Sequence, residues 1–272
     1  MSVRGISTVL RVECSKLTAQ LKAVIVLAAC VMGPFAFAAA IRMQSSVPSD
    51  TLFGRAVAES GFAAALVVLG FGALWAFPVL TSVVGGDIFS SEDRYGTWKT
   101  ILTRSRSRGD VFAGKIITAL LFSSVALVVL AVSSIAAGVL IIGAQPLVNL
   151  TGNLITPADA LARVALAWAS MLPPMFAFTA LAVLISVVSR SSAAGIGLPV
   201  VAGLTLQLVA MVDGPELVRR LLMTSAFGAW HGLLSEPPYY GPLVHGTLAS
   251  MAYFVICLAI AFGALGRREF GG

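Results

Sequence analysis

Long uncharged runs of apolar residues divide the chain into six segments, each long enough to cross a lipid bilayer. These runs are 23–41, 60–86, 116–144, 164–189, 191–212 and 246–265. A helix needs about 20 residues, at about 1.5 Å each, to span the hydrocarbon core. The runs are continuous and do not alternate in polarity, so they predict helices and not the strands of a closed barrel. The pattern predicts an all-α integral membrane protein with six transmembrane helices.

Composition supports this division, because 58% of the residues are hydrophobic and only 11% are charged. Little of the chain is left for a soluble domain. We therefore expect a cytoplasmic amphipathic helix over 1–22, a six-helix transmembrane domain over 23–265 and a cytoplasmic tail over 266–272. Three cysteines give no disulfide framework. The two histidines have no carboxylate or cysteine at ligand spacing, so no metal site is predicted.

The basic residues predict the orientation. Of the 18 Lys and Arg residues, 13 fall on one side of the six runs and five on the other. Lys and Arg are enriched in cytoplasmic loops. Both termini are therefore expected in the cytoplasm of a multi-pass plasma-membrane protein. The net charge of +6 then reflects topology and does not indicate nucleic-acid binding.

The first 22 residues carry an apolar stripe at steps of three and four. It consists of Val3, Ile6, Leu10, Cys14, Leu17 and Leu21. This spacing is typical of an amphipathic helix at the membrane interface, with a solvated lead-in as the alternative. The AFAAA at the end of the first run resembles a signal-peptide cleavage site. A run of 19 residues is longer than the usual apolar core of about 7–15, so a retained helix is expected.

The stretch 87–115 holds ten of the thirty charged residues and falls in the predicted cytoplasmic loop after the second span. Ser90 with Asp93, and Ser107 with Asp110, are helix-start signals. We expect a short helix from Ser90 to about Thr103, a basic turn, and a helix that leads into the third span.

Residues 109–115 also match the first seven positions of a phosphate-binding loop, G-x-x-x-x-G-K. The eighth position should be Ser or Thr, which reaches magnesium, and here it is Ile116. A buried strand should precede this motif, whereas a basic turn precedes it here. We expect no nucleotide site and no bound cofactor in this chain.

Four residues are candidates for a substrate path through the membrane: Phe71, Trp75, Gln207 and Met211. Ordinary helix packing is the alternative for each of them. The second span is longer than needed, so it should tilt, kink at Pro78 or extend into the cytoplasm. Pro173-Pro174 predicts a kink or break in the fourth span.

The segment 213–245 is apolar although it lies outside the predicted spans. Asp213-Gly214-Pro215 is a helix start, and Phe227, Trp230 and Leu234 continue with helical spacing. We expect a hydrophobic re-entrant segment that dips into the outer leaflet, with Trp230 and the following tyrosines at headgroup level. On the same side, Asn149-Leu150-Thr151 matches a glycosylation sequon.

These features together resemble the membrane subunits of type-2 ABC exporters. Members of that family tend to show an acidic residue, Gly-Thr, a Leu pair, Pro with a hydroxyl residue and Arg, and Gly-Lys at the third span. The corresponding residues are Glu92, Gly96-Thr97, Ile101-Leu102, Ser107-Arg108 and Gly114-Lys115. Ser105 stands where the family favours Pro, and Arg106 where it favours an apolar residue.

The resemblance implies two membrane subunits, identical or related, above two separate ATPase subunits that hold ATP and magnesium. This chain would then be a permease and not an enzyme. The implied ATPase-coupling residues are Glu92, Arg94, Gly96, Thr97, Lys99, Leu102 and Arg108. The expected cargo is a small hydrophobic or amphipathic substrate, such as a drug, an antibiotic or a lipid-like molecule. Its export would make the protein part of multidrug efflux or antibiotic resistance.

Three alternatives remain open from the sequence. The chain could be a permease for polysaccharide or cell-envelope lipid, a non-transporting sensor, or an intramembrane enzyme. The enzyme is disfavoured because both histidines lie in a predicted outer loop and H-E-x-x-H is absent.

Overall fold

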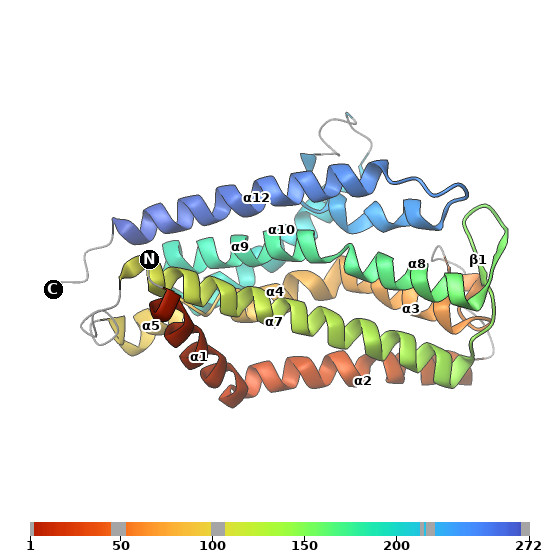
Figure 1. Ribbon diagram of the computed structural model, residues 1–272, viewed down its shortest axis with the longest axis horizontal. Coiled ribbons are helices and arrows are strands. Elements are labelled where there is room, and N and C mark those ends of the chain that lie inside the picture. The colour runs from red at the N-terminus through yellow and green to blue at the C-terminus, as the bar shows by residue number, and fades with distance from the viewer. Residues whose placement is uncertain (1–2, 45–52, 99–106, 213–214, 216–220, 268–272) are drawn as a thin grey trace.

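The computed structural model describes residues 3–44, 53–98, 107–212, 215 and 221–267, and these residues are mainly helical (Figure 1). Within them, six helical runs are long and apolar enough to cross a membrane. The runs comprise α2 (Leu21–Met43); α3 (Gly61–Phe71), η2 (Gly72–Ala76), α4 (Phe77–Gly85) and α5 (Ser90–Tyr95); α7 (Arg108–Ala137) and η3 (Gly138–Ile142); α8 (Pro157–Ala169) and α9 (Leu172–Ser189); α10 (Ser192–Met211); and α12 (Gly241–Gly266). The predicted all-α membrane protein with six spans is confirmed.

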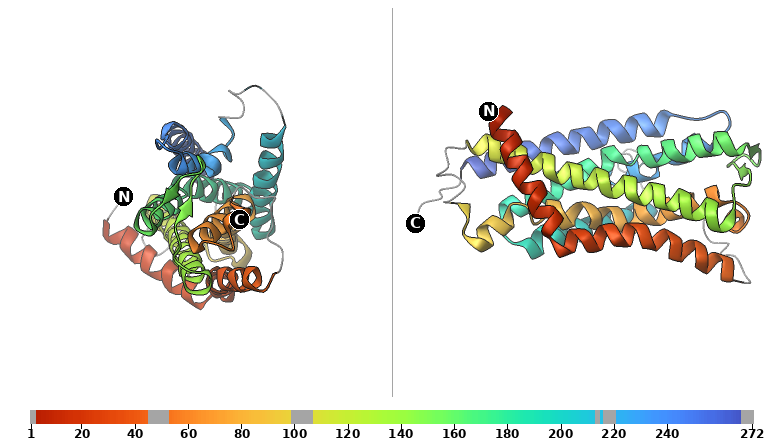
Figure 2. Two further views of the ribbon diagram at one scale, coloured as in Figure 1. Left: turned by 90° about the vertical axis from the view of Figure 1, so that its right-hand side faces the viewer. Right: turned by 60° about the horizontal axis from the view of Figure 1, so that its bottom comes forward.

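The remaining elements lie at the two ends of the bundle. At one end, α1 (Val3–Ala19) crosses the bundle obliquely before α2 begins, as Figure 2 shows. Both described termini and α5 lie at this end, which we call the α5 end. The opposite, hairpin end carries η1 (Gly54–Ala56), strands β1 (Leu147–Val148) and β2 (Leu154–Ile155), and nearby η4 (Ser225–Leu234).

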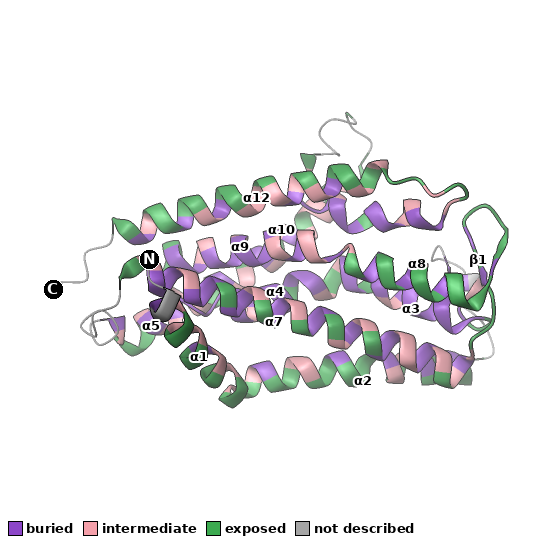
Figure 3. Cartoon of the chain, in the orientation of Figure 1, coloured by how far each residue is buried: buried purple, intermediate pink, exposed green. Residues whose placement is uncertain are grey.

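Burial separates central spans from peripheral ones (Figure 3). The spans built from α3–α5 and α8–α9 bury 61% of their apolar stretch each, whereas α2, α10 and α12 bury 22%, 17% and 22%. The outward residues of the peripheral helices are large and apolar, such as Val24, Leu208 and Ile256. A bilayer is the solvent that accepts such a surface. The peripheral helices therefore present faces suited to lipid or to another membrane subunit.

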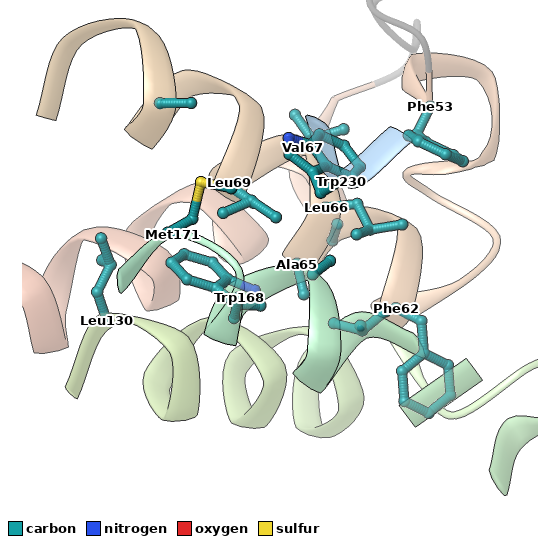
Figure 4. Packing of buried hydrophobic residues seen from close by; sticks show 14 of the residues in the cluster. Phe53, Phe62, Ala65, Leu66, Val67, Leu69, Leu130, Trp168, Met171 and Trp230 are labelled. Atoms are coloured by element: carbon teal, nitrogen blue, oxygen red, sulfur yellow. The ribbon is translucent and has the colours of Figure 1, made fainter. Parts of the chain in front are cut away.

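The largest core cluster is rich in aromatic residues toward the hairpin end. Figure 4 shows Trp168 beside Met171 and Leu69. Trp230 is 2% exposed and stacks on Phe53, with ring centroids 6.2 Å apart. The side chain of Trp230 is therefore packed inside the protein, and its position at headgroup level stays a prediction. Trp230 belongs to the 3-10 helix η4, which packs against the bundle, and the indole of Trp230 is part of the core.

Two spans are interrupted near prolines. The fourth span breaks at residues 170–171, and α9 then begins with Pro173 and Pro174 in its first turn. Proline lacks a backbone N–H and is tolerated in that position. The predicted break is therefore confirmed. In the second span the π-helical turn η2 ends just before Pro78, which lies in the first turn of α4.

Gln207 of α10 ties that helix to the π-helical turn. Its Nε2 donates to Ala73 O at 2.8 Å and to Leu74 O at 3.1 Å. A buried amide needs such partners, and a π turn has carbonyls that do not follow the α-helical pattern. Nearer the α5 end the same two spans meet at Gly86 and Gly195, where a Cβ on either glycine would clash with the other's carbonyl oxygen.

The sequon at Asn149 is part of the structure of the hairpin end. The Asn149 side chain is buried; its Oδ1 accepts from Thr151 N at 3.0 Å and its Nδ2 donates to Glu236 at 2.9 Å. Leu150 N also donates to Leu234 O at 3.1 Å. These bonds fasten the β1–β2 loop to the end of η4. The amide that a glycan would occupy is therefore engaged.

We expect Gln207→Leu to lower the free energy of unfolding by about 1–3 kcal/mol, because two carbonyl oxygens of η2 lose their donor. Thr205→Val is the matched control, since Thr205 is an exposed residue of the same helix. Its effect should stay within about 0.5 kcal/mol. Thermal unfolding in detergent measures both, and equal effects of the two variants would contradict the tether.

Candidate functional site

The helix α5 is shorter than predicted. It ends at Tyr95, and Gly96 has φ 64°, in the left-handed region. Gly96 N donates to Asp93 O and Thr97 N donates to Glu92 O, which is the bond pattern of a Schellman cap. The expected continuous helix from Ser90 to Thr103 is therefore wrong, because the glycine closes it after six residues.

Ser90 is not the N-cap that its sequence signal indicates. Turns continue from α4 into α5, and the cap position falls on Phe89, which has no side-chain bond. Ser90 is fully buried, and its backbone N–H donates to Ser186 Oγ at 3.0 Å. Its hydroxyl Oγ lies 3.1 Å from Ser192 Oγ. It therefore connects α5 to α9 and to the start of α10.

Four charged side chains from α1, α5 and α7 form what we call the four-charge cluster: Glu13, Lys16, Glu92 and Lys115. Lys115 Nζ lies 2.8 Å from Glu92 Oε1 and 3.2 Å from Glu13 Oε2. Lys16 Nζ lies 2.9 Å from each glutamate. Two lysines thus oppose two glutamates, and the formal charges cancel.

Burial makes this cluster a strong constraint. Lys115 is 1% exposed, and its ammonium also donates to Ile88 O at 2.8 Å. The hydroxyl of Thr97 donates to the second oxygen of Glu92. Removing one partner of a buried pair leaves an uncompensated charge in a poorly solvating interior. Burial alone would lower the pKa of Lys16, but its bonds to Glu13 and Glu92 outweigh burial and raise it.

The Gly-Lys step of α7 has a structural explanation. Residues 109–115 are helical, and Ser107 Oγ caps them by accepting from Asp110 N at 3.1 Å, as its start signal predicts. A Cβ at Gly114 would lie 2.6 Å from Val9 Cγ1, so glycine lets α1 lie against α7. The next residue, Lys115, reaches the cluster. This segment is therefore a helix–helix contact and not a phosphate-binding loop.

The other predicted coupling residues have different surroundings. Arg94 is exposed, and its guanidinium lies 4.8 Å from the ring centroid of the exposed Tyr95. Arg108 Nη1 donates to Gly266 O at 2.8 Å. Lys99 and Leu102 lie outside the described residues.

Sequence reasoning did not connect Glu13 and Lys16 to this site. The signal was present, because these two charges lie three residues apart in the lead-in, off its apolar stripe. It also missed Asp87, a buried carboxylate that pairs with Lys22 at the start of α2. That pair is a second link between the α5 region and the N-terminal helices.

An apolar cavity of about 490 Å³ lies between α3, η2, α10 and η4. Its wall includes Phe53, Phe71, Gln207, Phe227, Trp230 and His231. Of the four predicted path residues, Phe71 and Gln207 line it. Trp75 does not and is 59% exposed on the bundle surface. The side chain of Met211 lies outside the described part of the chain.

His231 is the titratable side chain on the described wall of this cavity. Its ring stacks on Trp230 with centroids 4.0 Å apart, and its Nδ1 lies 2.6 Å from Gly228 O. Burial lowers the pKa of His231, and the bond to Gly228 only partly opposes this. The ring is therefore neutral at pH 7.

Comparison with known proteins identifies the family. A family model described as ABC-2 family transporter protein matches residues 9–205. The chain belongs to the ABC-2 transporter family. It is thus a multi-pass membrane subunit of an ABC transporter, a family that works with ATPase partners. A search of curated proteins finds no match.

The matched residues of this ABC-2 subunit include all of the four-charge cluster but only part of the cavity wall. All four members of the cluster lie inside residues 9–205. Eight of the described residues of the cavity wall lie beyond residue 205, among them Gln207, Trp230 and His231. The cluster is therefore built from the family part of the chain, and the cavity is completed by residues that follow it.

Lys115→Met should lower the free energy of unfolding by about 3–5 kcal/mol, because one buried glutamate loses its counter-charge. Lys16→Met also leaves the two buried glutamates with one counter-charge fewer, but solvent reaches the position of this 43% exposed side chain, so the loss should be smaller, about 1–2 kcal/mol. Thermal unfolding of the purified subunit measures both. Equal losses of unfolding free energy in the two variants would contradict the larger contribution expected from the buried Lys115.

The wild-type protein should lose stability relative to His231→Phe as the pH falls below about 6.5. The unfolded histidine binds its proton there, while the buried ring does so only at lower pH, so the unfolded state gains protons first. Above that pH the difference between the two melting temperatures should be constant. A flat difference from pH 7.5 to 5 would contradict a depressed pKa.

Proposed function

We propose that this subunit exports a small hydrophobic or amphipathic molecule, with its α5 end in the cytoplasm against an ATPase. The observation that carries the proposal is the position of α5. This helix exposes Arg94 and Tyr95, while Ser90 and Glu92 on its buried side are bonded to α9, α10, α1 and α7. A push on the exposed side would reach all four helices.

The charge distribution supports the orientation. The loop 87–115 and both ends of the chain carry most of the Lys and Arg residues, and the described Lys16, Lys22 and Lys115 lie beside α5 and Asp87 at the α5 end. A polar cavity of about 610 Å³ beside α5, lined by Lys16, Lys22, Arg94 and Thr97 among others, offers further contacts for a soluble partner. Charge complementarity of this kind favours specific docking.

The apolar cavity supports the choice of cargo. It lies where η2 and α10 meet, so a movement of α10 would change its shape. Its volume and its few polar side chains suit a small apolar molecule better than a polysaccharide chain, whose many hydroxyl groups would need partners. In this proposal two permease subunits and two ATPases form the exporter, and the cargo passes between the cavity and the outside.

The structure also changes the best test of coupling. Glu92→Lys is the charge reversal that the sequence suggests. It would place a third lysine among Lys16 and Lys115, so it would disturb folding as well as coupling. Arg94 of α5 is a better target, because its side chain is exposed and lies outside the four-charge cluster, although its guanidinium lies 3.9 Å from Asp87 Oδ1.

Arg94→Glu should reduce ATP-dependent export by at least about fivefold, because a charge at the ATPase contact is reversed. The assay is uptake of the amphipathic dye Hoechst 33342 into inverted vesicles that contain the subunit and its co-purifying ATPase. Arg42→Glu, an exposed arginine at the far end of α2, is the control and should transport normally. Normal transport by Arg94→Glu would refute the contact, and no dye uptake by the wild type would refute this cargo class.

A further inference from the structure

Three polar side chains of the apolar cavity, Gln207, Ser225 and His231, have their hydrogens committed within the protein; Ser225 Oγ, for example, donates to Leu222 O at 2.7 Å. Gln207 Nε2 gives its two hydrogens to Ala73 O and Leu74 O. Only the carbonyl oxygen of this amide can then bond to another group, and it can only accept. On this side of the cavity the protein offers an acceptor.

His231 offers a second acceptor. Its Nδ1 faces the carbonyl oxygen of Gly228, which cannot donate, so the ring proton resides on Nδ1. In a neutral imidazole the other nitrogen, Nε2, is then an acceptor. Burial disfavours the protonated ring, and the stack on Trp230 fixes the plane of the ring.

Two further donors in the same wall do not change the conclusion that the cavity presents acceptors to a ligand. Trp230 Nε1 and Thr224 Oγ1 have no hydrogen-bond partner among the described residues, but both atoms are closed off by surrounding protein. A molecule in the cavity would not reach them without rearrangement. The rest of the described wall is mainly apolar, with the rings of Phe53, Phe71 and Phe227.

The absence of charge on the described wall narrows the ligand further. No Lys, Arg, Asp or Glu is among the described lining residues. A carboxylate would face acceptors and lose its hydration without gaining a counter-charge. An ammonium would likewise find no carboxylate partner among the described lining residues. A neutral donor, which both satisfies an acceptor and tolerates apolar walls, fits best.

We propose that this cavity binds an apolar molecule through a neutral hydroxyl group, which donates a hydrogen bond to His231 Nε2. Gln207 Oε1 reinforces the preference for donors. The role of such binding in export rests on the proposed function, but the binding itself requires neither ATP nor the ATPase. The cavity therefore selects for a hydroxyl-bearing apolar compound and against a carboxylate of the same shape.

The test compares three tritiated probes with one apolar body: 2-naphthaleneethanol, its methyl ether and 2-naphthylacetate. Binding to the full-length subunit in lipid nanodiscs is measured by scintillation proximity, with empty nanodiscs subtracted. The alcohol should bind about five- to tenfold more tightly than the ether, the value of one neutral hydrogen bond. The acetate should bind more weakly than either. Equal binding of alcohol and ether by the wild type would overturn the proposal.

His231→Phe keeps an aromatic ring against Trp230 and removes the acceptor. It should reduce the alcohol-to-ether preference at least threefold while ether binding stays near the wild-type value. His245→Phe changes the exposed histidine of α12 outside the cavity and should keep the full preference. An unchanged preference in His231→Phe would overturn the assignment. If the wild type prefers the alcohol over the ether but exports no dye, the proposed export is contradicted and the proposed binding site is supported.

Discussion

The buried ammonium of Lys115 is the constraint on which the α5 end depends. An ammonium with 1% exposure must find carboxylates and carbonyls, and it finds them on two helices and a turn, at Glu13 of α1, Glu92 of α5 and Ile88 just before α5. The arrangement also requires Gly114, because a larger residue would hold α1 away. Helices that share such a charge cannot separate without exposing it, so α1, α5 and α7 form one body.

The opposite end is held together differently. There α10 is joined to η2 by two neutral hydrogen bonds from Gln207 beside a cavity of about 490 Å³. Neutral bonds contribute about 1 kcal/mol each, less than a buried charge network. A displacement that enters at α5 and passes through Ser90 to α9 and α10 would meet least resistance at this joint. In the proposed transport cycle, the helices joined by the four-charge cluster move together, and the contact between α10 and η2 changes.

Much of the fold could be predicted because its causes are local. Uncharged runs give the six spans, Pro173-Pro174 gives the break in the fourth, and Ser107 caps α7. The failures involve contacts between distant segments. Ser90 looks like a cap but bonds to Ser186, and the sequence did not predict that Trp230 stacks on Phe53. Charge patterning singled out the stretch that contains Glu92 and Lys115, yet it could not pair Lys115 with a glutamate in α1.

The family match ends at residue 205. The four-charge cluster lies wholly before this residue, and part of the wall of the apolar cavity lies after it. A contact with an ATPase must keep the same geometry whatever is transported, so its charge network belongs naturally to the part that the family shares. A cargo site must differ between transporters, so it can draw on residues outside that part. Gln207 and His231 both follow residue 205, and both present acceptors to the cavity. In the proposed function, the acceptors that select the cargo therefore come from α10 and η4, which follow the matched residues.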